Sequence, residues 1–331
     1  MNRIHILALL LSIGIFFPCA ARPEEPAGGG TLSVVFENDV FYNNDRQYTS
    51  GLLFLWVPDR EASPQGWARK AARLLPWVPE NGRFAPGYSF GQSIFTAKNL
   101  GAPVPFITDR PYAGWLYGSA GLNVRSDESF DRFQFFLGAI GPASLAEETQ
   151  EALHVLLGSE KAQGWDFQLG NEPGAFVTYR HGWRGLLAKT MSGKRLDFTP
   201  HAGGALGNVF TYGNAGFTVR YGRNLPDDDG PPRIQPGLQG WGDFSPADGF
   251  RWYLYGGVDA RAVARDVFLD GNTFRGSRSV EREPLVCDFE AGFVLAWSRY
   301  RLSFANVLRT REFTTQDKHN TFGALTFSVG K

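Results

Sequence analysis

The chain has 331 residues, with 33 Lys and Arg against 33 Asp and Glu, so it carries no net charge. With this balance, no net positive field points to nucleic-acid binding. With 28 Phe, 9 Trp, 11 Tyr and 40 Gly, the chain is rich in aromatic residues and glycine.

The N-terminus predicts a secretory signal peptide. Arg3 precedes an apolar stretch from about residue 6 to 17, and the small residue Ala21 ends a plausible cleavage site. The stretch is shorter than the roughly 20 residues that span a bilayer, which disfavours the alternative of a retained anchor helix. We therefore expect residues 1–21 to be removed and residues 22–331 to form a single domain.

Cleavage at this site removes Cys19 and leaves Cys287 as the one cysteine of the mature chain. A disulfide framework and a thiolate metal site are then excluded. A secreted chain that is aromatic, Gly-rich and nearly free of cysteine is typical of an outer-membrane β-barrel, whose closed edges let it cross lipid.

Alternating apolar and polar residues predict about twelve strands. Between 195 and 202, for example, Arg195, Asp197, Thr199 and His201 alternate with smaller or apolar residues. In a soluble β-sandwich the two faces would exchange roles, so alternation alone leaves that alternative open. The signal peptide and the even strand number favour an all-β transmembrane antiparallel barrel. The expected strands are 31–38, 48–57, 86–95, 112–124, 131–140, 174–184, 195–206, 214–223, 250–263, 284–297, 299–309 and 319–329.

Two segments predict helices. Residues 63–77 form a basic amphipathic stretch, either interfacial or a cap on the barrel rim. Residues 141–166 contain Ser144 and Glu147 in the spacing of a capping box, and Gly158 is suited to end a helix. These signals predict a short helix at about 145–157 that carries His154. The apolar stripe expected to dock it, with His154 off its centre, is Leu145, Thr149, Ala152, Leu153 and Leu156.

Strand parity predicts where the polar motifs lie. If the N-terminus is periplasmic, the loops after the first, third and fifth strands are extracellular. They hold residues 38–48, residues 95–115 and the helix with His154. The unusual polar motifs therefore share one rim, and the loops of the opposite rim show no comparable motif.

This rim carries candidate catalytic residues. A neutral His154 is suited to act as a general base, and Glu160 is placed to orient it or to bind a metal. Asn38 and Asp39 offer hard oxygen ligands that suit Ca²⁺ better than Zn²⁺, and Thr49 adds a hydroxyl or a backbone donor that helps to hold an oxyanion. The alternatives are a His that only packs and Asn and Asp that only make a turn. No G-x-S-x-G motif supports a serine hydrolase.

Four motifs resemble the family of outer-membrane lipid A 3'-O-deacylases. They are ENDVF at 37–41, DRQYTSG at 45–51, DRPYAGW at 109–115 and the long segment 140–174 that contains a His-x5-Glu pair. The resemblance covers essentially the whole mature chain.

The resemblance implies a twelve-stranded barrel with Ca²⁺-dependent hydrolysis of the 3'-linked acyloxyacyl chain of lipid A. It places the catalytic His on His154, its acidic partner on Glu160, the Asn-Asp pair on Asn38 and Asp39, and the family's Thr on Thr49. A basic residue thought to meet the lipid phosphate falls on either Lys98 or Arg110, and the spacing does not decide between them.

We therefore expect an outer-membrane carboxylic ester hydrolase that acts as a monomer on lipid A of lipopolysaccharide in the outer leaflet, with Ca²⁺ as cofactor and Asp39 as its chief ligand.

 The alternatives are a barrel phospholipase that acts on glycerophospholipids and a non-catalytic outer-membrane barrel that is porin-like or structural. The helix is expected in an extracellular loop over the active site.

Overall fold

The computed structural model describes residues 29–39, 47–58, 82–157, 161–191, 193–238, 240–244 and 246–330. The expected signal peptide, the expected helix at 63–77, Gly158 and Glu160 lie outside these residues. Among the described helices, none is long and apolar enough to cross a membrane.

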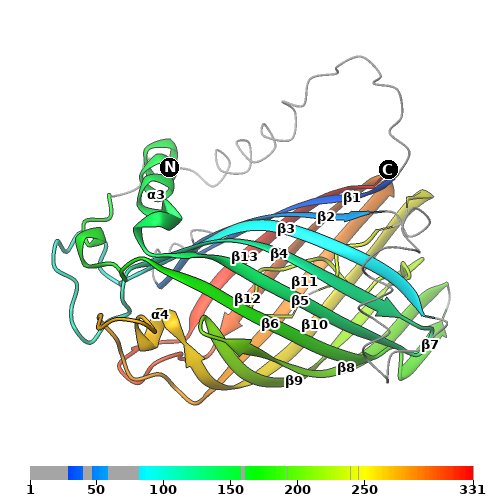
Figure 1. The fold of residues 1–331 in the computed structure, drawn as a ribbon. Coiled ribbons are helices and arrows are strands. Elements are labelled where there is room, and N and C mark those ends of the chain that lie inside the picture. Colours follow the sequence, from blue (N-terminus) through cyan, green and yellow to red (C-terminus); the bar gives the residue numbers. More distant parts are fainter. Residues whose placement is uncertain are drawn as a thin grey trace.

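The described strands form one closed antiparallel sheet (Figure 1). Each strand pairs with the next along the chain, except that β6 pairs with β8 and not with β7, and β1 pairs with β13 to close the barrel. The strands are β1 (Gly30–Asn38), β2 (Gln47–Pro58), β3 (Arg83–Thr96), β4 (Ala113–Arg125), β5 (Ser129–Ile140), β6 (Glu172–Trp183), β7 (Leu187–Met191), β8 (Lys194–Gly207), β9 (Phe210–Arg223), β10 (Ala247–Asp266), β11 (Leu285–Ser298), β12 (Tyr300–Arg309) and β13 (Asn320–Gly330).

The barrel has twelve strand positions, as the sequence predicted, because β6 and β7 share one of them. Residues 201–207 of β8 pair with β6, whereas residues 194–198 of β8 pair with the short β7. β7 therefore continues the ladder of β6 after a turn.

Alternation along the strands separates a lipid-facing surface from the lumen. On β2, Phe54 and Trp56 are exposed, whereas Leu53 and Leu55 are buried. The lumen contains paired charges: on β8, Asp197 accepts two hydrogen bonds from Arg220, at 3.0 and 2.7 Å. The polar face therefore lines the lumen, which is the arrangement expected of a membrane barrel.

Connections at the two ends fill the lumen differently. At the end where β1 stops lie the helices η3 (Pro142–Ser144), α3 (Ala146–Leu157), η4 (Trp165–Phe167) and α4 (Val267–Asp270). We call this the α3 end. Here aromatic side chains form an apolar layer in the lumen, with Phe268 of α4 stacked on Phe95 at 4.2 Å between ring centroids.

At the opposite end, the connection between β9 and β10 folds back into the lumen. We call residues 224–246 the lumenal segment. Its Arg233 and Asp228 are buried and bind charged residues of the wall. The expectation that loops of this end hold no comparable motif was therefore wrong. Charged residues of the strands pair with charged residues of this Pro-rich connection. These partners are distant in the sequence, so inspection of the loop sequence alone does not reveal the pairs.

Candidate functional site

Asn38 lies on the lipid-facing side of the wall yet is covered. On β1, Ser33 and Glu37 face the lumen, where Ser33 bonds Ser328 and Glu37 bonds Arg233. Alternation then turns Leu32 and Asn38 outward. Leu32 is 41% exposed, but Asn38 is only 6% exposed. A neighbouring part of the chain therefore covers the amide.

Thr49 reaches the same face through an irregularity in β2. The register between β2 and β3 shifts between Tyr48 and Ser50, which leaves Thr49 as the extra residue of a β-bulge. Its Oγ1 lies 2.6 Å from Oγ1 of Thr96, and Thr96 has the same parity as the exposed Phe90 of β3. The bulge therefore places the Thr49 hydroxyl on the outer side of the wall.

Asp39 directly follows β1 and is fully buried. A carboxylate, the Asn38 amide and the Thr49 hydroxyl are hard oxygen donors, and this donor chemistry fits Ca²⁺ and not Zn²⁺. Among the described residues, no group of three or more His, Cys, Asp or Glu is arranged to hold a metal. A cation here would thus rely on one carboxylate completed by neutral oxygens.

α3 covers this part of the wall from outside. It packs against β3 and β4. At its start, a side chain on Gly114 of β4 would lie 1.9 Å from Oγ of Ser144 and 2.3 Å from Cβ of Ala146. Gln92 of β3 also donates a hydrogen bond of 2.7 Å to the Ser144 carbonyl. Gly114 and Gln92 therefore dock the beginning of the helix on the wall.

His154 lies on the face of α3 that is turned toward the protein. Ala146, Gln150 and His154 follow at intervals of four residues and are 1%, 2% and 7% exposed, whereas Val155 is 85% exposed. Gln150 accepts a hydrogen bond of 2.9 Å from Nε1 of Trp165.

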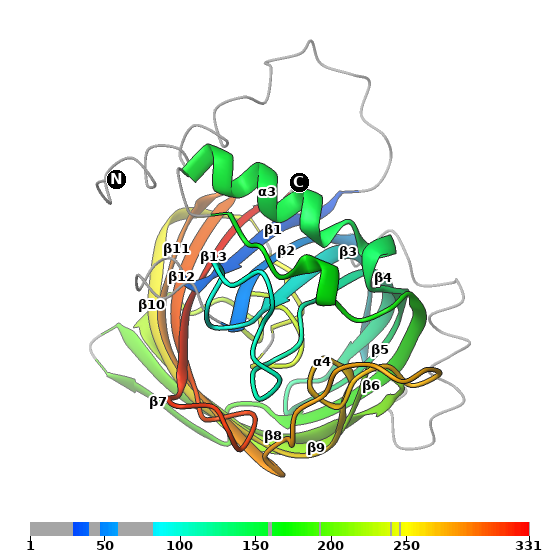
Figure 2. The ribbon, with the colours of Figure 1, turned by 90° about the vertical axis from the view of Figure 1, so that its left-hand side faces the viewer.

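The course of α3 carries His154 toward β1 and β2. Figure 2 shows the helix crossing the outside of the wall from β4 toward β1. Eight residues of helix advance by about 12 Å, which is about two and a half strand spacings. A helix that starts over Gly114 of β4 therefore brings His154 over the strands that carry Asn38 and Thr49.

Two sequence expectations about this helix were wrong. The capping box does not form, because the Ser144 hydroxyl donates to the Gly141 carbonyl instead, at 2.6 Å. The predicted apolar stripe is not the docked face either, since Leu145 and Ala152 are exposed. The docked face combines small and polar residues because it covers a polar patch of the wall.

The two candidate basic residues occupy different environments. The side chain of Lys98 is 43% exposed and pairs with Asp317. Arg110 is fully buried, pairs with Glu312 at 3.2 Å and lies over the ring of Phe95. Of the two, only Lys98 has a side chain that solvent reaches.

Sequence reasoning missed Gln92, Thr96 and Gln150 as parts of this site. Gln92 and Thr96 share the outward parity of the exposed Tyr88 and Phe90. A polar residue at a lipid-facing position is the signal that indicates a cover, and it was available in the sequence.

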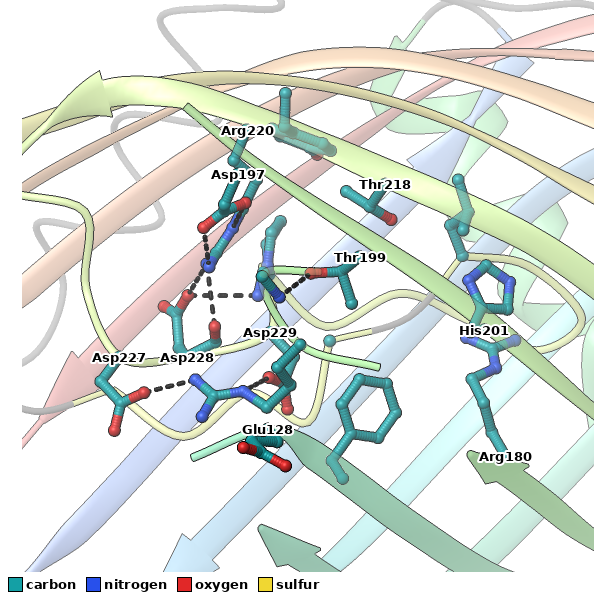
Figure 3. A pocket seen from close by; sticks show the side chains of 18 of the residues that line it. Glu128, Arg180, Asp197, Thr199, His201, Thr218, Arg220, Asp227, Asp228 and Asp229 are labelled. Carbon is teal, nitrogen blue, oxygen red and sulfur yellow. Dashed lines mark hydrogen bonds and ion pairs between the residues drawn. The ribbon is translucent and has the colours of Figure 1, made fainter. Parts of the chain in front are cut away.

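A cavity of about 570 Å³ lies toward the opposite end, between the strands and the lumenal segment. Figure 3 shows Arg220 beside Asp197 and Asp228 in this cavity. Arg220 pairs with Asp197 and Asp228, and Arg184 pairs with Asp227 and Asp229. This cavity lies toward the end of the barrel opposite α3. The charged side chains named here already form ion pairs with one another.

Comparison with known proteins supports the assignment of the fold. The sequence profile of the family described as outer membrane protein LpxR matches residues 6–330. The solved structure of LpxR from Salmonella typhimurium has a TM-score of 0.72 at 20% identity and covers 90% of this chain and 99% of that chain. No curated protein matches the chain.

Two further solved structures are autotransporter barrels. The β domain of the Bordetella autotransporter BrkA has a TM-score of 0.45 at 10% identity, covering 92% of this chain and 99% of its own. The transport unit of AIDA-I from Escherichia coli has a TM-score of 0.37 at 8% identity, covering 98% and 97%. These scores are too low to carry an argument about this chain.

Proposed function

Because this outer-membrane chain belongs to the LpxR family of lipid A 3'-O-deacylases, we propose that it removes the 3'-linked acyloxyacyl chain from lipid A. The observation that carries the proposal is the covered polar patch on the lipid-facing side of the wall. A site on the lipid-facing side of the wall, under α3, would receive its substrate from the outer leaflet and not from the lumen. The protein acts as a monomer on lipopolysaccharide.

His154 is the general base of the proposed reaction. Its imidazole takes a proton from a water molecule, and the oxygen of that water attacks the carbonyl carbon of the ester. The bond between this carbon and the alcohol oxygen then breaks, and the alcohol oxygen takes the proton back from the imidazolium. The products are a free acyloxyacyl acid and a 3'-hydroxyl on the sugar. In this proposal Glu160 orients the imidazole. The role of Glu160 is proposed from the sequence alone.

Asn38, Asp39 and Thr49 would hold the group that stabilises the developing negative charge. Asp39 is the chief ligand for Ca²⁺, and bound Ca²⁺ supplies positive charge that stabilises an oxyanion. Asn38 and Thr49 add polar groups on the same face of the wall, where exclusion of water strengthens such interactions. Lys98 is the rim residue suited to bind a lipid phosphate.

Mass spectrometry of lipid A tests the proposal. Cells that express the chain should show lipid A lacking the 3'-linked acyl chain, and cells that express the His154→Ala variant should retain it. Purified protein should be assayed on lipid A and on phospholipid vesicles in parallel. Release from phospholipid alone would favour the phospholipase alternative, and no release from either would favour a non-catalytic barrel.

A further inference from the structure

The lumenal segment is anchored to the wall along the opposite half of the barrel. Its Phe244 exchanges two hydrogen bonds with the Thr31 hydroxyl, at 3.1 and 3.2 Å. Its Asp229 pairs with Arg125 at 2.9 Å. Its Asp228 pairs with Arg220 at 2.8 Å, and Figure 3 shows this second pair. These contacts fix the base of the segment near the beginning of β1.

The tip of the segment reaches the other end of β1. Arg233 Nε donates to Oε1 of Glu37 at 2.7 Å, and the backbone N–H of Ile234 donates to the same oxygen at 3.1 Å. Arg233 also donates to Glu290 of β11 at 2.5 Å. Arg233 and Glu37 are both buried, and Glu37 directly precedes Asn38.

Glu37 also binds the strand that carries Thr49. The Tyr48 hydroxyl donates to Oε2 of Glu37 at 3.1 Å. A side chain on Gly51 would lie 2.3 Å from the Tyr48 hydroxyl and 2.5 Å from Cδ1 of Ile234. The lumenal face of β2 is therefore shaped to receive the tip of the segment.

We propose that Arg233, acting through Glu37, is a positioning residue for the site on the other face of the wall. The wall is one strand thick, and neighbouring residues on a strand point to opposite faces. The lumenal segment fixes the ends of β1 and β2 from inside, while α3 covers them from outside. The inference rests on the proposed function, in which Asn38, Asp39 and Thr49 hold Ca²⁺ and the oxyanion.

Glu37→Gln is the first test. The amide oxygen can still accept from the backbone N–H of Ile234, and the amide NH₂ can donate to the Tyr48 hydroxyl. The substitution removes the charge that pairs with Arg233, and Arg233 keeps Glu290, so we expect the barrel to fold. A misplacement of about 1 Å can cost roughly 100-fold in rate. We expect kcat for acyl release to fall by about 10- to 100-fold, with weaker Ca²⁺ binding by calorimetry.

Thr31→Val is the matched control, because it removes a contact between the same strand and the same segment. Thr31 lies six residues before Glu37, about 20 Å along the strand. It should keep wild-type kcat and Ca²⁺ binding even if the barrel becomes less heat-resistant. Equal behaviour of Glu37→Gln and Thr31→Val in both measurements would overturn the inference.

Arg233→Lys provides a second variant if Glu37→Gln does not fold. The same losses of kcat and Ca²⁺ binding are expected, and wild-type values in a folded Arg233→Lys protein would overturn the inference. The calorimetry separates this result from the proposed function. A wild-type protein that binds Ca²⁺ but hydrolyses neither lipid would refute the function, whereas weaker binding in the variants alone would still support positioning.

Discussion

A polar side chain on the lipid-facing side of a barrel strand is costly unless another part of the protein covers it. Asn38 has this position and is almost completely buried. His154, on the cover, is buried as well. A structural role alone would be met more simply by apolar residues at both places, so their chemistry is the better explanation for their presence.

His154→Ala tests the base. We expect acyl release to fall by about 10²- to 10⁴-fold, the usual contribution of general-base catalysis, while the barrel stays folded because alanine favours helix. His319 is exposed in a loop at the same end, so His319→Ala should keep wild-type activity. His201 is a poorer control, since it is buried against Asp259. Near wild-type release by His154→Ala would show that the base is misassigned.

Asp39→Asn tests the metal ligand, because the amide keeps the shape of the carboxylate and removes its charge. We expect the Ca²⁺ concentration for half-maximal activity to rise at least about tenfold, in line with the weight of carboxylate charge in Ca²⁺ sites. Glu281→Gln, at an exposed acidic residue of the α3 end, is the control and should leave the Ca²⁺ response unchanged. A wild-type protein that a chelator does not inhibit would contradict the metal role.

Glu312 predicts a pH effect on stability. Burial raises the pKa of this carboxyl, but the positive charges of Arg110 and Arg309 outweigh burial and hold the pKa below its ordinary value. A depressed pKa contributes stability that is present above the unfolded value of about 4.3 and is lost as the pH falls through the folded value. Glu312→Gln should therefore lower the unfolding temperature at pH 7.

The difference between wild type and Glu312→Gln should shrink as the pH falls below about 4, toward the depressed pKa at which the folded wild-type carboxyl becomes neutral. Heat-modifiability on gels, followed from pH 3 to pH 7, measures it. A difference that does not depend on pH would show that the pair of Glu312 with Arg110 contributes through packing and not through charge.

At the scale of elements, the sequence predicted that a helix carries His154 but not how that helix docks. α3 lies within a residue or so of the expected range, although the capping box that indicated its start does not form. The docked face depends on what the helix covers. The usual rule that the apolar stripe faces the protein selected Leu145 and Ala152, which are exposed. The rule fails here because the wall beneath the helix is polar.

Gly114→Val tests whether α3 must lie close to the wall. The new side chain would collide with Ser144 and Ala146, so the start of the helix has to lift. We expect most acyl release to be lost, because a shift of about 1 Å at His154 is already costly. Gly118→Ala on the same face is the control, since its nearest contact would be a carbonyl oxygen at 3.8 Å. Full activity of a folded Gly114→Val protein would exclude a role for close docking.

At the scale of the whole molecule, alternation predicted the barrel and its strand limits well, because a membrane wall imposes period two on every strand. The lumenal segment was not predictable in this way. Its place depends on pairs such as Arg233 with Glu37, whose members are separated by 196 residues in the sequence. Contacts of this kind leave no local pattern in either partner.

Two separate parts of the protein fill the lumen, one in each half of the barrel, and this predicts the ion conductance of the barrel in a bilayer. An apolar layer with Phe95 and Phe268 fills the α3 end, and the lumenal segment fills the other half. We therefore expect no steady ion conductance from the purified wild-type protein in planar bilayers. Stepwise conductance like that of a porin control would instead support a channel.

Replacing residues 230–240 with a Gly-Ser linker separates sealing from positioning. The aromatic layer remains in this variant, so it should still conduct no ions. The contacts of Arg233 and Ile234 with Glu37 are lost, so acyl release should fall as it does in Glu37→Gln. A variant that stays folded and fully active would show that the segment only fills the lumen. A variant that conducts ions and stays active would identify the segment as a seal, because its removal would then open a path without disturbing the outer face of the wall.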